Sequence, residues 1–150
     1  MDVGEICTRS VISARADEPI TVAATRLRRF HVGDLVVLDP GHAAPRPVGI
    51  LTDRDITVAV VAEAPDALQH LTCADLVRAP LVSVDENEDV FVAVERMSEA
   101  GVRRLPVVDE RGDLVGILAL DDLYGLLART LAALAGISRD QREREWEGRP

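Results

Sequence analysis

The sequence contains the same segment twice. Residues 6–39 align with residues 76–109 at a constant offset of 70, and residues 48–56 align with residues 115–123 at an offset of 67. Of the 43 aligned positions 14 are identical, whereas ordinary composition would give roughly 3 or 4 matches. The period is longer than that of solenoid repeats and propeller blades, so the pattern indicates a duplicated small domain. Because a duplicated fold has an internal interface, and ligands tend to bind at interfaces, we expect a site between the two copies.

The size of each copy implies that the two share a core. A unit of roughly 60 residues buries only about 60% of the surface that its unfolded chain exposes, so one copy alone would be marginally stable. Apolar residues make up 47% of the 150-residue chain but aromatic residues only 3%. The shared core should therefore consist of Val, Leu, Ile and Ala.

Strands alternate with helices in the same order in both copies, which predicts a small α/β unit used twice. In the first copy we expect a helix with Asp17 as its N-cap, an apolar stripe that ends at Phe30, and Arg26 on the solvent side. In the second copy we expect Asp85 to cap the corresponding helix. The predicted strands are 11–14, 35–38, 48–51, 81–84, 105–108 and 114–118, and the predicted closing helices run from Thr52 to about Ala62 and from Leu120 through Leu134.

Charge and composition argue against several classes of function. The net charge of −9 disfavours a nucleic-acid partner, because phosphate-backbone binding requires a basic face. No segment approaches the ~20 consecutive apolar residues of a membrane helix, and the N-terminus lacks a signal-peptide pattern, so we expect a cytoplasmic protein. Cys7 and Cys73 form no CxxC pair and should be small reduced thiols; a disulfide or redox switch is the alternative. The three histidines have no neighbours at metal-ligand spacing, so no metal site is expected.

The segment 49–55, Gly-Ile-Leu-Thr-Asp-Arg-Asp, is the sharpest local motif. Thr52 and Asp55 lie on one turn at a helix start, beside backbone N–H groups that lack helical partners. Such a pair could hold the vicinal hydroxyls of a ribose. The same pair could instead form a capping box, in which the two side chains satisfy the helix start. The tetrapeptide alone leaves both interpretations open.

Taken together, these motifs resemble the CBS domain, the small α/β module named after cystathionine β-synthase. The resemblance covers nearly all of residues 3–125. It rests on the acid-Pro helix start at 17–24, the strand that ends in Pro-Val-Val-Asp at 106–109, and the closing Gly-Ile-hydrophobic-Thr-x-x-Asp at 49–55. Two tandem copies in the correct order carry the identification. We therefore expect CBS repeats at residues 3–62 and 73–134, a linker at 63–72 and a charged tail at 135–150 that frays or extends the preceding helix.

The resemblance implies a fold, an assembly and a class of ligand. CBS domains occur as pairs that pack sheet to sheet about a pseudo-twofold axis, and two pairs often form a disc-shaped dimer, so a homodimer is expected. Their cleft commonly binds AMP, ADP, ATP, S-adenosylmethionine or NAD-type molecules as regulatory ligands, with no required cofactor. The closing Thr/Ser and Asp bind ribose, and basic residues before the central strand meet phosphate.

Transferred to this sequence, the two expected sites are unequal. The first repeat has Thr52 and Asp55 for ribose but Gly33-Asp34 at the phosphate position, where the carboxylate would repel phosphate; Arg54 is a candidate replacement cation. The second repeat has Arg103, Arg104 and Asp122, but Ala119 in place of the hydroxyl residue. For the arginines, the alternatives are an exposed first-turn residue at 54 and a solvated helix end at 103–104. We expect at most one strong nucleotide site per chain.

Three classes of function follow from this sequence. The leading hypothesis is a stand-alone regulatory sensor that binds an adenosine-containing ligand and acts on an unknown protein effector. The alternative is a dimerisation or interaction scaffold without nucleotide binding, suggested by an apolar helix stripe formed by Leu123, Leu126, Leu127, Leu131 and Leu134. An enzyme is not expected, because no catalytic Ser-His-Asp, Cys-His or phosphate-loop pattern appears.

Overall fold

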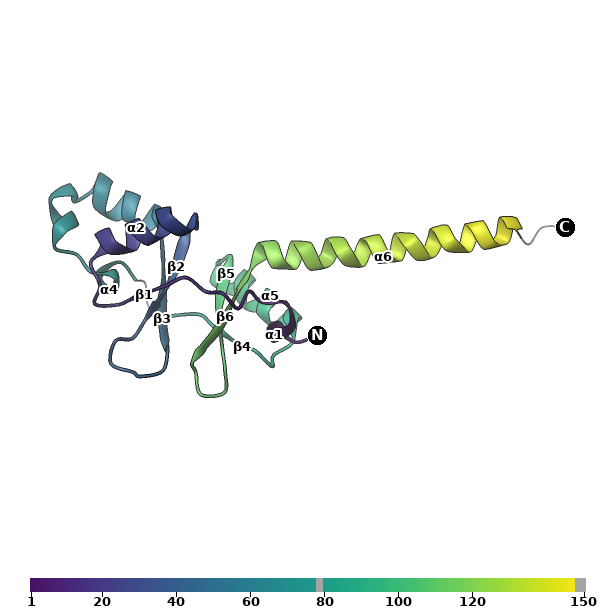
Figure 1. Ribbon diagram of the computed structural model, residues 1–150, viewed down its shortest axis with the longest axis horizontal. Helices are drawn as coiled ribbons and strands as arrows, with labels where there is room; N and C mark the ends of the chain where they lie inside the picture. Colours follow the sequence, from purple (N-terminus) through teal and green to yellow (C-terminus); the bar gives the residue numbers. More distant parts are fainter. Residues whose placement is uncertain (78–79, 148–150) are drawn as a thin grey trace. The chain divides into compact units, whose positions relative to one another are not determined.

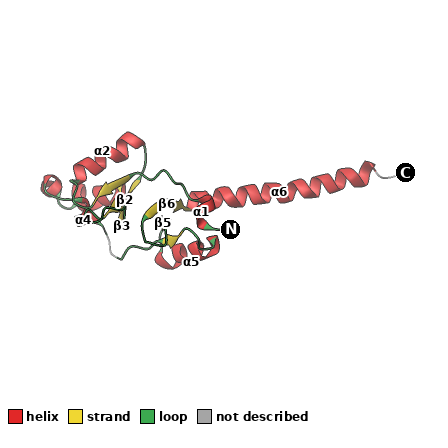
Figure 2. Cartoon of the chain, turned by 60° about the horizontal axis from the view of Figure 1, so that its bottom comes forward, coloured by secondary structure: helices red, strands yellow, loops and turns green. Residues whose placement is uncertain are grey.

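A computed structural model describes residues 1–77 and 80–147. The chain forms two compact units, Met1–Leu118 and Ala119–Pro150. The first unit contains most of both sequence copies, and two three-stranded sheets form its framework (Figure 2). Among the described residues, no helix is both long enough and apolar enough to cross a membrane.

The first copy forms a sheet in the order β1-β2-β3. Strand β1 runs parallel to the central strand β2, and β3 runs antiparallel to it. A three-residue helical turn, α3, follows β3 and leads into a π-helix at Ile56–Ala62, so the expected closing helix is wider than an α-helix. The elements of this copy are α1 (Val3–Ile6), β1 (Ser13–Arg15), α2 (Ile20–Phe30), β2 (Asp34–Leu38), β3 (Pro47–Thr52) and α3 (Asp53–Asp55), followed after the π-helix by a 3-10 helix at Pro65–Gln69.

The second copy repeats this plan with the sheet order β4-β5-β6. Its last element differs from the first copy, because α6 is one continuous helix of 28 residues. The predicted helix through Leu134 is thus extended to Glu147, while the last three residues of the predicted tail lie outside the described residues. The elements are α4 (Cys73–Leu76), β4 (Val84–Asp85), α5 (Val90–Ala100), β5 (Arg104–Val108), β6 (Leu114–Ala119) and α6 (Leu120–Glu147) (Figure 1).

Two predicted helix caps were wrong. Helix α2 begins at Ile20 with Pro19 at its N-cap, and the side chain of Asp17 instead accepts two hydrogen bonds of 2.9 Å from Arg15. Helix α5 is capped by Asp89, whose carboxylate accepts the amide of Phe91 at 2.9 Å. In both cases an acid several residues upstream of the helix was mistaken for its cap. The edge strands β1 and β4 also begin two or three residues later than predicted, where they first pair with the central strands.

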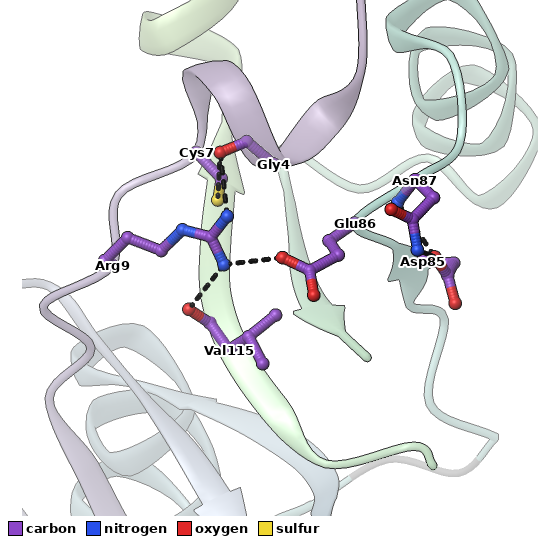
Figure 3. A network of polar contacts seen from close by, with 7 residues as sticks. All are labelled: Gly4, Cys7, Arg9, Asp85, Glu86, Asn87 and Val115. Carbon is purple, nitrogen blue, oxygen red and sulfur yellow. Dashed lines mark hydrogen bonds and ion pairs between the residues drawn. The ribbon is translucent and has the colours of Figure 1, made fainter. Parts of the chain in front are cut away.

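The leading segment of the first copy, residues 3–9, packs on the second copy. The backbone amides of Val3 and Gly4 in α1 donate to the carbonyls of Glu88 and Glu86 at 2.9 and 2.8 Å. Arg9 reinforces this attachment with a 2.8 Å hydrogen bond to the Glu86 carboxylate and a 2.9 Å bond to the Gly4 carbonyl (Figure 3). The start of the chain therefore completes the second half of the fold.

The leading segment of the second copy, residues 73–77, packs on the first copy in the same way. The amides of Cys73 and Ala74 in α4 donate to the carbonyls of Glu18 and Ala16, both at 2.9 Å. These four residues are the counterparts, at the offset of 70, of those that hold α1. The exchange is reciprocal, and it explains how two copies that are individually too small can share one stable unit.

Two equivalent glycines permit this exchange. A Cβ atom at Gly49 would lie 2.0 Å from Cγ1 of Val77, and one at Gly116 would lie 2.7 Å from Sγ of Cys7. Cys7 and Val77 occupy the same position in the two leading segments. Any side chain on either glycine would meet the segment that crosses over from the other half.

The core is aliphatic, as the composition predicts. Its fully buried side chains include Ile20, Leu35, Leu51, Leu105 and Leu118. Phe30, which the sequence pattern placed on the buried stripe, is instead 47% exposed. Cys73 lies in this core, and burial raises the pKa of its thiol to about 11. Both cysteines are thiols, with Cys73 buried and Cys7 half-buried.

An arginine on the first long helix braces each half. Arg26 donates to the carbonyl of Ser13 at 2.8 Å and to both carboxylate oxygens of Glu18 at 2.7 and 2.9 Å. Its counterpart Arg96 donates to the carbonyl of Ser83 at 3.0 Å and to Glu88 at 2.6 and 2.5 Å. Arg26, predicted on the solvent side of the helix, is one third exposed, and its guanidinium also ties the helix to the edge strand.

Candidate functional site

A cavity of about 640 Å³ opens between the two halves of the first compact unit. One wall comes from the end of β3 and the turn after it, and the other comes from the link between α5 and β5. The first half contributes Gly33, Ile50, Thr52, Asp53 and Arg54, and the second half contributes Gly101, Val102, Arg103 and Arg104. The cavity thus combines polar, cationic and apolar groups from both copies.

The helix start at Thr52 forms a capping box. The hydroxyl of Thr52 accepts the amide of Asp55 at 3.0 Å, and the Asp55 carboxylate accepts the Thr52 amide at 2.9 Å. The hydroxyl also donates to the same carboxylate at 2.6 Å. Of the two interpretations of this motif, capping is therefore the one that the geometry shows. Thr52 lines the cavity, whereas Asp55 is not among its lining residues.

Asp53 is the carboxylate that the closing turn presents to the cavity. Its backbone amide donates to the carbonyl of Gly33 at 3.0 Å, which fixes the start of the turn against the link that leads into β2. Arg54 follows it and lines the same cavity. Asp53 was not among the predicted site residues, because the family pattern places the functional acid two residues later.

Asp34 and Arg104 form an ion pair between the two halves. The Nε atom of Arg104 lies 3.0 Å from a carboxylate oxygen of Asp34, and the Asp34 side chain is only 11% exposed. These residues occupy equivalent positions at the starts of β2 and β5, so each copy brings the same position to a common point with the opposite charge. Burial raises the pKa of the Asp34 carboxyl, while Arg104 opposes this shift and Asp53 adds to it.

The second closing motif keeps half of the capping box. The Asp122 carboxylate accepts the amide of Ala119 at 2.8 Å, as Asp55 accepts the amide of Thr52. Ala119 has no hydroxyl to complete the motif. Asp122 lies on α6 in the second compact unit, whereas Arg103 and Arg104 belong to the first.

The structure therefore groups the predicted site residues differently from the sequence. Thr52 and Arg54 of the first repeat line one cavity together with Arg103 and Arg104 of the second. These four residues were predicted to belong to two separate sites. The opposite charges at the equivalent positions 34 and 104 were the signal in the sequence that could have indicated contact between the two halves at this point.

Metal binding has no support among the described residues. Across residues 1–77 and 80–147, no group of three or more His, Cys, Asp or Glu side chains could hold a metal ion. The chemistry that the cavity offers is hydrogen bonding from a hydroxyl and a carboxylate, together with cationic contacts from three arginines.

Comparison with curated proteins finds relatives that span most of the chain. The uncharacterized protein MK0525 of Methanopyrus kandleri is 32% identical over 123 residues, which are 82% of this chain and 61% of that protein. The chain thus spans less than two thirds of this relative's length. Hypoxic response protein 1 of Mycobacterium tuberculosis is 32% identical over 119 residues, which are 79% of this chain and 80% of that protein.

Solved structures match this fold over similar lengths. Hypoxic Response Protein I, crystallised with two coordinated zinc ions, matches with a TM-score of 0.71 and 30% identity and covers 83% of this chain and 97% of that chain. The CBS domain pair of protein MJ0100, in complex with 5′-methylthioadenosine and S-adenosyl-L-methionine, has a TM-score of 0.73 and 25% identity and covers 87% and 98%. The CBS domain protein PAE2072 from Pyrobaculum aerophilum, complexed with AMP, has a TM-score of 0.69 and 27% identity and covers 82% and 90%.

The family model of the CBS domain matches two segments of the sequence, residues 3–62 and 73–129. These segments contain both sheets, the reciprocal leading segments and the lining of the cavity. The α/β fold expected from the repeat is confirmed, and the chain belongs to the CBS domain family as a tandem pair.

Proposed function

We propose that this CBS pair is a regulatory module that binds an adenosine-containing ligand in the cavity between its halves. The observation that carries the proposal is the convergence of Thr52, Asp53 and Arg54 from one copy with Arg103 and Arg104 from the other. A ribose needs acceptors and donors for its hydroxyls, and an anionic group needs cations. The cavity supplies both within about 640 Å³, a volume within the usual range for small-molecule sites.

Each wall of the cavity has a distinct role in this proposal. Asp53 accepts the ribose hydroxyls beside Thr52, while Ile50 and Val102 contact the base. Arg54 and Arg103 meet the anionic part of the ligand, because among the described residues neither forms an ion pair within the protein. The ribose contacts predicted for Asp55 and Asp122 remain predictions of the family resemblance.

Related proteins support this ligand class. MJ0100 and PAE2072, which share 25% and 27% of their residues with this chain, were crystallised with adenosine-containing ligands. Ligand binding would act through a protein effector and not through catalysis.

A panel of ligands tests the proposal directly. AMP, ADP, ATP, S-adenosylmethionine and NADH are added to the wild type, and thermal unfolding and calorimetric titration are recorded. A ligand present at one hundred times its Kd stabilises the folded state by about 2.7 kcal/mol, which gives a clear thermal shift. Arg103→Ala should weaken binding, whereas Arg129→Ala, which removes an exposed arginine from α6, should leave it unchanged. A wild type that none of these ligands stabilises would reject the proposal.

A second candidate function is a dimerisation scaffold built on α6. The exposed side chains of this helix include Leu127, Leu131 and Leu134, which are 55%, 57% and 56% exposed and recur at helical spacing. This stripe continues beyond residue 129, where the match to the family model ends. Light scattering after size exclusion tests this role, with Leu131→Glu expected to produce monomers and Ala128→Glu, on an adjacent face, as the control. A homodimer that survives Leu131→Glu would exclude the stripe as its interface.

A further inference from the structure

We infer that Asp34 sets the ligand class of the cavity by holding Arg104, so that the site accepts adenosine-containing ligands with at most one phosphate group and disfavours polyphosphates. This inference rests on the proposed function, because it concerns the selectivity of the same cavity. It assigns a role to Asp34, which does not itself line the cavity.

The ion pair with Asp34 limits what Arg104 can offer to a ligand. Arg104 lines the cavity, but its Nε atom lies 3.0 Å from the Asp34 carboxylate. The protein thus already provides a negative charge to this arginine. A ligand phosphate brought to Arg104 must share the guanidinium with Asp34 and approach that carboxylate at short range, where like charges repel.

The balance of charge in the cavity supplies the second step. Three cations are present, namely Arg54, Arg103 and Arg104, together with the carboxylates of Asp53 and Asp34. The groups at the cavity therefore carry about one net positive charge. One phosphate group can be accommodated beside Arg54 and Arg103, whereas a triphosphate would bring several charges that the remaining cations do not neutralise.

Burial makes the effect of Asp34 persistent. The side chain is 11% exposed, so water screens its charge less than it would on the surface. The residue is also anchored on β2, where its Cα pairs with that of Thr52 on β3. Asp34 therefore remains close to the wall that holds the ligand.

The experiment measures selectivity and not binding alone. Dissociation constants for adenosine, AMP and ATP are determined by calorimetry at one ionic strength for the wild type, Asp34→Asn and the control Asp17→Asn. Asp17 is also paired with an arginine, Arg15, but lies outside the cavity lining. Asp34→Asn should tighten ATP binding by about tenfold or more and AMP binding less, because it removes one negative charge close to the phosphate groups. Adenosine has no phosphate group, so its binding should change by less than about twofold. Asp17→Asn should leave all three constants unchanged.

The possible outcomes separate this inference from the proposed function. If the proteins bind these ligands but Asp34→Asn leaves the ratio of ATP to adenosine affinity unchanged, the role of Asp34 is rejected and the proposed function stands. If neither wild type nor variant binds any of the three, the proposed function is rejected and the inference with it. Thermal unfolding of each variant verifies folding, and Asp34→Ser replaces Asp34→Asn if the latter does not fold.

Discussion

The first half of the molecule carries a hydroxyl at the start of its closing helix and a carboxylate at the start of its central strand, while the second half carries an alanine and an arginine at these positions. Thr52 aligns with Ala119 in the sequence, and Asp34 aligns with Arg104. Both halves nevertheless share the same sheet order, the same helix brace and the same exchanged leading segment. The duplication has retained the contacts that hold the fold, whereas the polar and charged groups around the cavity differ between the halves. Substitutions that make the halves more alike, or more different, test this division.

The largest effect is expected where the two exchanged segments pass over their glycines. Gly49→Ala should cost about 3 kcal/mol of unfolding free energy, because its methyl group overlaps a branched Val77 side chain whose Cβ is also within 3.0 Å. Gly116→Ala should cost less, about 1 to 2 kcal/mol, since its nearest neighbour, Sγ of Cys7, can change rotamer, and the carbonyl oxygen of Thr8 then remains as a tight contact at 3.2 Å. Denaturant unfolding measures both changes.

Rescue by a second substitution is the control for this pair. Val77→Ala removes both Cγ atoms and should restore part of the stability lost in Gly49→Ala, but none of that lost in Gly116→Ala. Equal losses for the two glycine variants, or a rescue that does not depend on which glycine was changed, would show that the overlap is not the cause.

The next largest effect concerns the helix braces, which are the same in both halves. Arg26→Met and Arg96→Met should each cost about 2 kcal/mol, because each removes hydrogen bonds to a carboxylate and to a backbone carbonyl. Both side chains are about one third exposed, so the values should lie at the low end for charge-assisted bonds. A loss confined to one half would contradict the equivalence of the two braces.

The pH dependence of the second brace has a definite sign. Hydrogen bonding from Arg96 lowers the pKa of Glu88 in the folded state. The stabilisation is therefore fully present above the unfolded pKa of about 4.3 and is lost as the pH falls through the lowered folded value. The difference in unfolding free energy between wild type and Arg96→Met should shrink when denaturation is repeated at decreasing pH from 6 to 3. A difference that stays constant over this range would exclude the ion pair as its source.

The sequence predicted the parts of this comparison that depend on local pattern. Alternation of apolar runs and turns indicated the order of strands and helices, and the resemblance selected Thr52, Arg54, Arg103 and Arg104, which the structure places around one cavity. It could not predict that these residues meet, because residues in different copies are brought together by packing between the halves and not by spacing along the chain. The charge of Asp34 was recognised as unfavourable to phosphate, but its ion pair with Arg104 was not predicted. The two cap predictions were wrong because Asp17 and Asp85 have the correct residue type but lie upstream of the position where the helix geometry begins.

A moderate effect is expected at the point where equivalent positions meet with opposite charge. Asp34→Arg makes the halves alike and places two arginines together, which should destabilise the protein, and Arg104→Asp should do the same with two carboxylates. The double variant restores an opposite pair and should recover about 1 kcal/mol relative to the sum of the single changes. A double-mutant cycle in denaturant measures this coupling energy. Strict additivity of the two substitutions would mean that the pair contributes nothing to the attachment of the halves.

The smallest effects are expected at the two closing helices, where one hydroxyl distinguishes the halves. Thr52→Ala removes the side chain that accepts the Asp55 amide and should cost about 1 kcal/mol. Ala119→Thr adds the missing hydroxyl beside Asp122, whose carboxylate already accepts the backbone amide of residue 119, and should stabilise the start of α6 by about 0.5 kcal/mol. Because α6 belongs to a separate compact unit, global unfolding suits only the first variant, and amide hydrogen exchange at Asp122 should report the second. Slower exchange at Asp122 in Ala119→Thr, together with faster exchange at Asp55 in Thr52→Ala, would show that the hydroxyl serves the helix start in either half, so that the ligand contact proposed for Thr52 would be a second role of a capping residue.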